Sequence, residues 1–142
     1  EVAEPAGAVR AQTRLGATVL VVDDEELVGR AAGSALEGAG HKVQVFVSPV
    51  AALRSFRDRG RDFDVAVIDM VMPEMTGQEL FSQLRALQPD LAVVLTSGHV
   101  PTQVVQQLLE LGAKEFLGKP FSPSELVASV ERCLDPATET ST

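Results

Sequence analysis

The stretch Thr18-Val19-Leu20-Val21-Val22-Asp23-Asp24-Glu25-Glu26 joins a short apolar run directly to four consecutive acidic residues. A continuous apolar run of this length is typical of a β-strand that is covered on both faces, as in a parallel sheet. In open sheets of that kind, ligands bind beyond the carboxyl ends of the strands. Asp23 and Asp24 therefore stand where a functional site is expected.

The same pattern, a short apolar run followed by a helical stretch, recurs along the chain. We predict five strands, at Thr18–Val22, Lys42–Phe46, Val65–Ile68, Ala92–Leu95 and Glu115–Leu117. Apolar residues recur at helical spacing after each strand, starting with Leu27, Ala31 and Leu36 in the first helix. The later helices are expected to open at Ser48-Pro49, Thr76, Pro101 and Ser122-Pro123. Five alternations of strand and helix indicate an α/β fold with a parallel sheet and helices on both faces.

Length and composition are those of one globular domain. The chain has 142 residues, of which 45% are hydrophobic and 23% are charged. The irregular composition of the two ends predicts a linker or tail at 1–16, the domain at 17–135 and a flexible tail at 136–142. Because the chain begins with Glu1 rather than Met, we expect a fragment or a processed piece.

The charge balance excludes some classes of partner. Twelve basic residues against twenty acidic ones give a net charge of −8. We therefore expect no direct contact of this domain with nucleic acid or with a membrane. The sequence shows no transmembrane-length apolar run and no signal sequence, and its single cysteine, Cys133, cannot form an internal disulfide. The expected location is cytoplasmic, with membrane anchoring left open for the parent protein.

Polar side chains also follow three of the later strands. Asp69 follows the third predicted strand, Ser97 the fourth and Lys119 the fifth. Carboxylates gathered at one edge repel one another unless a cation is present, and oxygen ligands favour Mg²⁺, with Mn²⁺ as an alternative. Such a site can neutralise an incoming phosphoryl group while a carboxylate attacks it, with Lys119 and Ser97 binding its oxygens. The residues alone therefore suit the formation of an aspartyl phosphate.

Four stretches together resemble the receiver domain of two-component response regulators. They are Val19–Glu25, Val67–Gly77, Leu95–His99 and Phe116–Phe121, and the resemblance covers about Ala17 to Leu134. It implies a flavodoxin-like doubly wound fold with five parallel strands in the order 2-1-3-4-5. Each motif alone is moderately specific, whereas all four in order, each at the end of a strand, are highly specific.

The resemblance also implies a role for each residue of the site. Asp69 is the implied phosphoacceptor and Asp24 the main metal-binding carboxylate, with Asp23 acting mostly through water. The backbone carbonyl of Val71 is the implied third protein contact of the metal. Lys119 is implied to pair with the phosphoryl group, and its peptide bond to Pro120 is expected to be cis.

Two further residues are implied to carry the response to phosphorylation. Ser97 lies 22 residues before Lys119 and precedes Gly98, as the switch hydroxyl of the family does, whereas the neighbouring Thr96 lies 23 before it. We therefore choose Ser97. Phe116 stands three residues before Lys119, where the family often has an aromatic residue that turns inward. The surface implied to respond comprises the fourth helix, the fifth strand and the fifth helix, and it could also form a dimer.

The implied partner is a histidine kinase or a histidine phosphotransfer domain. A receiver catalyses its own phosphotransfer and slow autodephosphorylation rather than a multiple-turnover reaction. The loose ends of the chain favour the carboxyl-terminal receiver of a hybrid sensor histidine kinase, and a stand-alone single-domain response regulator is the alternative. A haloacid-dehalogenase-type aspartyl phosphatase is less favoured, because Val71 stands where its second aspartate is needed. A receiver-like module that is never phosphorylated remains a third hypothesis.

Several polar residues are interpreted as structural. Glu25 and Glu26 are expected to serve the amino-terminal end of the first helix and solubility. His41 follows Gly40 in a predicted turn and is expected to be exposed to solvent. Cys133 is expected to be a small apolar residue on the last helix.

Overall fold

The computed structural model describes residues 16–59 and 63–134, and in them five strands form one parallel sheet. The strands are β1 (Thr18–Val22), β2 (Lys42–Phe46), β3 (Val65–Asp69), β4 (Ala92–Ser97) and β5 (Glu115–Gly118), in the order β2-β1-β3-β4-β5. The predicted fold class and strand order are confirmed. The last three strands extend past their predicted ends, so that Asp69 and Ser97 are the final residues of β3 and β4.

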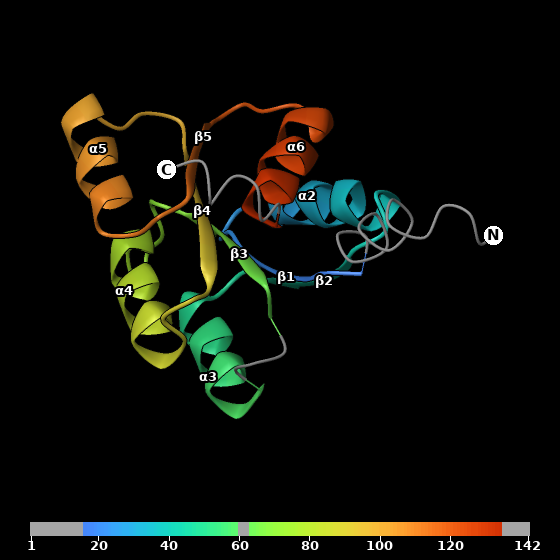
Figure 1. Ribbon diagram of the computed structural model, residues 1–142, viewed down its shortest axis with the longest axis horizontal. Helices are drawn as coiled ribbons and strands as arrows, with labels where there is room; N and C mark the ends of the chain where they lie inside the picture. Colours follow the sequence, from blue (N-terminus) through green and yellow to red (C-terminus); the bar gives the residue numbers. More distant parts are fainter. Residues whose placement is uncertain (1–15, 60–62, 135–142) are drawn as a thin grey trace, which may run out of the picture.

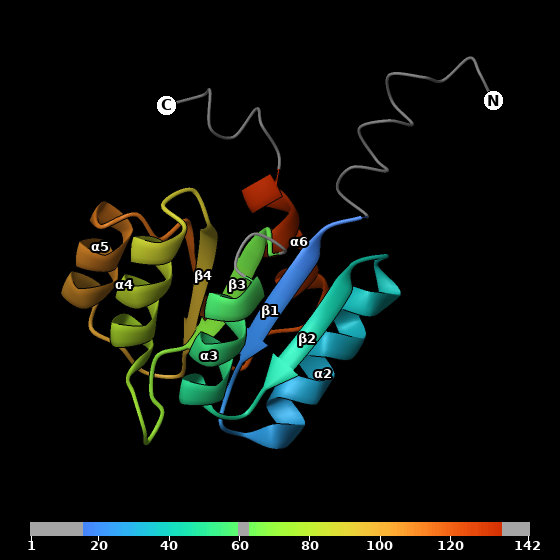
Figure 2. The same ribbon diagram turned by 90° about the horizontal axis from the view of Figure 1, so that it is seen from below.

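Helices cover both faces of the sheet (Figure 1 and Figure 2). They are α2 (Glu26–Gly38), α3 (Pro49–Arg59), α4 (Gly77–Leu87), α5 (Thr102–Glu110) and α6 (Pro123–Leu134). α2 and α6 pack on one face, while α3, α4 and α5 pack on the other. All strand arrows in Figure 2 that can be followed point toward the same edge, so the carboxyl ends of the strands share one rim.

The unbroken apolar run of β1 is explained by burial on both of its faces. Leu20 and Val22 lie in the core with α3 and α4, whereas Val19 and Val21 lie in the core with α2 and α6. Successive strand residues point to opposite faces, so a central strand between two helical layers needs apolar residues at every position. At about 25 cal/mol per Å² of buried apolar surface, these two cores supply the main stabilisation of the fold.

Side-chain caps begin three of the helices near their predicted starts. Thr76 Oγ1 accepts from the backbone N–H of Glu79 at 3.1 Å, and the Glu79 carboxylate accepts from the Thr76 N–H in return. Ser122 and Glu125 form the same reciprocal pair before α6. Ser48 Oγ accepts from the Ala51 N–H at the start of α3. These caps satisfy N–H groups that have no partner within the helix.

The buried residues of α2 are Gly29, Ala32, Gly33 and Leu36, whereas Leu27 and Ala31 are exposed. The sequence prediction for His41 is wrong. His41, expected in solvent, is only 4% exposed, and its Nε2 lies 3.4 Å from Glu131 Oε2 on α6. The turn at Gly40, with φ of +100°, returns the chain to the sheet so that His41 lies under α6 rather than outside it.

The predicted terminal tails lie outside the described residues, apart from Gly16. Among the helices of residues 16–59 and 63–134, none combines the length and the apolar character needed to cross a membrane.

Candidate functional site

The carboxyl ends of neighbouring strands bring three aspartates together. Asp23 and Asp24 follow β1, and Asp69 ends the adjacent strand β3. One carboxylate oxygen from each lies within 4.8 Å of the others, with Asp23 and Asp69 buried and Asp24 exposed. The fold thus assembles the three acidic residues that the sequence placed at the ends of separate strands.

Two hydrogen bonds hold Asp23, one through its backbone and one through its carboxylate. Its backbone N–H donates to the carbonyl of Phe46 on β2, and its Oδ1 accepts from the backbone N–H of Glu25 at 2.9 Å. The second bond closes a short turn in which the aspartate side chain acts as a backbone acceptor. Asp23 Oδ2 remains directed at the rim, where it meets Lys119.

Lys119, which directly follows β5, places its ammonium group among these carboxylates. Its Nζ lies 2.9 Å from Asp23 Oδ2 and 3.2 Å from Asp69 Oδ1. Its backbone N–H donates to the carbonyl of Ser97, and its peptide bond to Pro120 is cis. Burial alone would lower the pKa of Lys119, but the hydrogen bond and charge of Asp23, followed by Asp69, outweigh burial and raise it well above its ordinary value. The lysine is therefore a fixed positive charge among the aspartates.

Asp69 is destabilised as an anion in spite of that lysine. Burial, and then the negative charge of Asp23, raise the pKa of Asp69 from 3.8 to about 6, against the opposing effect of Lys119. Burial and the neighbouring Asp23 carboxylate thus both disfavour the ionised form of Asp69. A divalent cation would relieve this repulsion.

The donor set fits a hard divalent cation such as Mg²⁺. All three side chains offer oxygen atoms, they converge within a small space, and one of them, Asp24, is open to solvent and so to the waters that Mg²⁺ retains. Among the described residues no sulfur or imidazole ligand joins the cluster. Val71 follows Asp69 by two residues in the β3–α4 loop, and its side chain is 69% exposed.

Backbone contacts fix the loop that follows Asp69. The Met70 N–H donates to the carbonyl of Thr96, and the Gly77 N–H donates to the carbonyl of Met70. Gly77 lies so close to the strand that an added Cβ would press on the Asp69 carbonyl oxygen and lie 2.7 Å from Met70 Cα. This close approach requires glycine and holds the end of β3 in place.

Ser97 and Phe116 lie on the two strands beyond β3. Ser97 is buried at the end of β4, and its Oγ accepts from the His99 N–H at 3.4 Å. Thr96 is also buried and pairs in register with Asp69, whereas Ser97 pairs with Gly118, next to Lys119. Phe116 is half-buried and packs against the core on the α3–α5 side of the sheet.

Glu25 is a member of this cluster that the sequence interpretation missed. The sequence predicts a role at the helix end and in solubility, yet Glu25 Oε1 lies 3.2 Å from Lys119 Nζ. The contact spans 94 residues of sequence, so no local pattern predicts the pairing with Lys119. The place of Glu25 directly after Asp23 and Asp24 indicates only that it lies near the same edge of the sheet.

Comparison with known proteins identifies the family. The profile described as "Response regulator receiver domain" matches residues 19–131. The chain is 36% identical over 119 residues to the sensor kinase CckA of Brucella abortus, covering 84% of this chain and 13% of that protein. It is 35% identical over 116 residues to the transcriptional regulatory protein DctD of Rhizobium meliloti, covering 81% of this chain and 25% of that one. The chain thus spans a quarter or less of the length of these two relatives.

Solved structures show the same fold. A response regulator receiver domain protein from Clostridium thermocellum superposes with a TM-score of 0.80 at 27% identity, covering 87% of this chain and 98% of that one. A BeF3-activated DrrB receiver domain gives a TM-score of 0.72 at 27% identity, covering 84% and 97%. With the profile match over most of the described residues, the chain belongs to the response regulator receiver domain family.

Proposed function

We propose that the domain accepts a phosphoryl group on Asp69 from a phosphohistidine of a histidine kinase or a histidine phosphotransfer domain. The observation that carries this proposal is the position of Lys119 Nζ, 2.9 Å from Asp23 and 3.2 Å from Asp69. An ammonium group held there can neutralise a phosphoryl group as it arrives on Asp69.

The transfer is a substitution at phosphorus. An Oδ atom of Asp69 forms the new P–O bond while the P–N bond of phosphohistidine breaks, and the electron pair of that bond stays on the imidazole nitrogen. The product is an acyl phosphate and a histidine that takes up a proton from solvent. The raised pKa of Asp69 means that its ionised, nucleophilic form predominates only above about pH 6 unless a cation is bound.

Asp24, Asp69 and the backbone carbonyl of Val71 would hold Mg²⁺ or Mn²⁺, with Asp23 contributing mostly through water. The bound cation would neutralise phosphoryl oxygens and keep Asp69 ionised. Lys119 and Ser97 would each bind one further phosphoryl oxygen.

We infer that the signal leaves through the surface formed by α5, β5 and α6. Ser97 ends β4 beside β5, so a shift of its hydroxyl toward a phosphoryl group is transmitted to the half-buried Phe116. Phosphorylation then biases two arrangements of this surface. The same surface is a candidate site of dimerisation.

We also propose that the domain is carried by a cytoplasmic part of a hybrid sensor histidine kinase. The support is the match to the sensor kinase CckA, and the comparable match to the regulator DctD supports a response regulator as the alternative. The reading frame that encodes this chain distinguishes the two.

Phosphoramidate tests the proposed reaction, because it presents a P–N bond as phosphohistidine does. With Mg²⁺, we expect the domain to acquire a phosphoryl label that hydroxylamine removes, as it does from acyl phosphates. The Asp69→Asn variant should acquire none. Equal labelling of the variant would show that another residue is phosphorylated, and an unlabelled wild-type domain would contradict the proposed function.

A further inference from the structure

Glu25 occupies a helix-capping position without using its side chain as a cap. It precedes α2 with extended backbone angles, and its carboxylate makes no capping hydrogen bond. Its backbone N–H is bound instead by Asp23 Oδ1. The side chain is therefore free of the helix, and it reaches across the rim to Lys119 Nζ at 3.2 Å.

The three carboxylate partners of Lys119 differ sharply in exposure. The side chains of Asp23 and Asp69 are 7% and 6% exposed, whereas that of Glu25 is 63% exposed. Water and salt screen an exposed ion pair far more than a buried one. Of the three ion pairs of Lys119, the one with Glu25 is therefore the one whose loss costs the least free energy.

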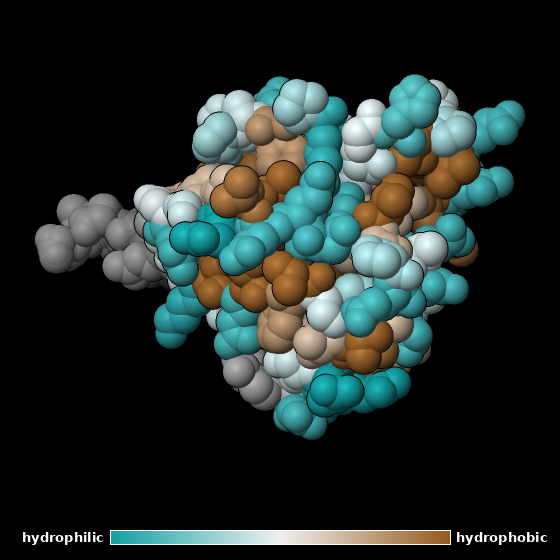
Figure 3. Space-filling model, turned by 180° about the vertical axis from the view of Figure 1, so that it is seen from behind, coloured by the Kyte–Doolittle hydropathy of each residue, from teal (hydrophilic) through white to brown (hydrophobic). Residues whose placement is uncertain are grey.

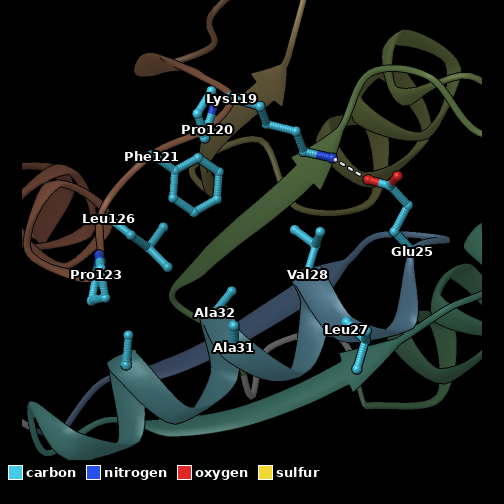
Figure 4. A pocket seen from close by; sticks show the side chains of 11 residues that line it. Glu25, Leu27, Val28, Ala31, Ala32, Lys119, Pro120, Phe121, Pro123 and Leu126 are labelled. Carbon is cyan, nitrogen blue, oxygen red and sulfur yellow. Dashed lines mark hydrogen bonds and ion pairs between the residues drawn. The ribbon is translucent and has the colours of Figure 1, made fainter.

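The Glu25–Lys119 pair closes one end of an apolar groove. This groove, about 530 Å³ in volume, lies between α2 and the segment from Lys119 to Leu126. Val28, Ala31 and Ala35 line the α2 side, and Phe121, Pro123 and Leu126 line the other. Figure 4 shows the two charged side chains meeting across its end.

The groove opens beside the phosphorylation site. Figure 3 looks onto the face toward which the strand arrows of Figure 2 point, and hydrophobic side chains gather there in several places between hydrophilic ones. Lys119 belongs both to the aspartate cluster and to the lining of the groove. A movement of this one side chain therefore affects both.

We propose that Glu25 is a positioning residue that competes with the phosphoryl group for Lys119 Nζ, and that the Glu25–Lys119 ion pair is a latch across the groove that phosphorylation of Asp69 releases. The inference rests on the proposed function. A phosphoryl group brings about two negative charges to the buried side of Lys119, which draws the ammonium group away from its exposed partner. The ion pair that spans the end of the groove beside α2 is then broken.

Thermodynamic linkage makes the latch measurable. If occupancy of the phosphoryl site breaks the Glu25–Lys119 pair, the pair must in turn oppose that occupancy by the same factor. Breaking an exposed ion pair of this kind lowers the affinity of the phosphoryl site by a factor of up to about five. Removing the Glu25 charge should therefore tighten binding of a phosphoryl analogue up to about fivefold.

Beryllofluoride with Mg²⁺ provides a reversible probe, and NMR titration gives its affinity. We expect Glu25→Gln to bind beryllofluoride two- to fivefold more tightly than the wild-type domain, with the difference shrinking at high salt. The matched control is Glu26→Gln, which removes the same charge one residue further along, on a side chain that has no described contact with Lys119. This control should bind as the wild type does.

A second readout follows the groove itself. In the wild-type domain, the methyl signals of Val28 and Leu126 should shift when beryllofluoride binds, and in Glu25→Gln they should be shifted part of the way without it. If Glu25→Gln and Glu26→Gln change the affinity equally, or if the methyl signals of Glu25→Gln match those of the wild type, the latch is wrong and the proposed function stands. If the wild-type domain binds no beryllofluoride and accepts no phosphoryl group, the proposed function itself fails.

Discussion

At the scale of single residues, the site is a balance between buried carboxylates and one ammonium group. Asp23 and Asp69 share Lys119, and burial, followed by the charge of Asp23, raises the pKa of Asp69 to about 6 against the opposing effect of Lys119. The residue types and their places at strand ends were readable from the sequence. The sharing of one lysine by three carboxylates was not, because it depends on side-chain directions across four strands.

The raised pKa of Asp69 predicts how Mg²⁺ should affect stability at different pH values. The folded state binds this proton more tightly than the unfolded chain does, so the contribution to stability is present below about pH 4 and is lost as the pH rises through about 6. Mg²⁺ stabilises the ionised form. The increase in Tm caused by Mg²⁺ should therefore be larger at about pH 7.5 than at about pH 5, as thermal unfolding followed by circular dichroism would measure.

The Asp69→Asn variant is the control for this prediction, because its side chain cannot ionise. In that variant, the Mg²⁺-induced increase in Tm should be smaller at about pH 7.5 and should change less with pH. An equal pH dependence in both proteins would mean that another group governs cation binding.

The choice of Ser97 over Thr96 gives a second prediction at this scale. Replacing Ser97 by Ala removes a hydroxyl beside Lys119, and we expect the affinity for beryllofluoride with Mg²⁺ to fall about tenfold or more, as for a lost hydrogen bond to a charged group. Thr96→Val, which removes the neighbouring hydroxyl at nearly constant shape, should leave the affinity within about twofold of the wild type. The reverse order of effects in an NMR titration would assign the switch hydroxyl to Thr96.

At the scale of elements, the strands were easier to predict than the faces of the helices. A central parallel strand such as β3 is apolar throughout because both of its sides are buried, and this leaves a plain pattern in the sequence. α2 packs instead through Gly29 and Gly33, where an added Cβ would lie 3.0 Å and 2.9 Å from the Val45 side chain. A search for large apolar residues at helical spacing finds the exposed Leu27 and passes over such a face.

Gly77 lies at the junction between β3 and α4, and we expect a methyl group added there to lower stability. Gly77→Ala would place a Cβ against the backbone at Asp69 and Met70, neither of which can move without shifting the Asp69 side chain. We expect a loss of roughly 1–3 kcal/mol in the free energy of unfolding, measured by urea denaturation, together with slower phosphorylation by phosphoramidate.

Gly38→Ala is the matched control for Gly77→Ala. Gly38 is the last residue of α2, and an added Cβ there meets nothing within 4 Å. This substitution should leave stability unchanged or raise it by up to about 1 kcal/mol, because alanine favours the helix. Equal losses for the two variants would show that Gly77 is not a special position.

At the scale of the whole molecule, the two helical layers leave one rim of the sheet free for chemistry. The sequence predicted this rim from the polar residues that follow four of the five apolar runs, and the family resemblance implied the strand order and a role for each site residue. What neither supplied is the link between the rim and the groove beside α2, which Lys119 and Glu25 make through a contact between distant parts of the chain. That link exists only once β1 and β5 end at the same edge.

We propose Asp69 as the phosphoacceptor of a cation-dependent receiver. The most direct measurement is mass spectrometric mapping of the domain after incubation with phosphoramidate and Mg²⁺, with borohydride reduction to mark the acyl phosphate. We expect one phosphoryl group per chain, located on Asp69 and absent when the cation is chelated before the reaction. A phosphoryl group on any other residue, or none on the folded wild-type domain, would contradict it.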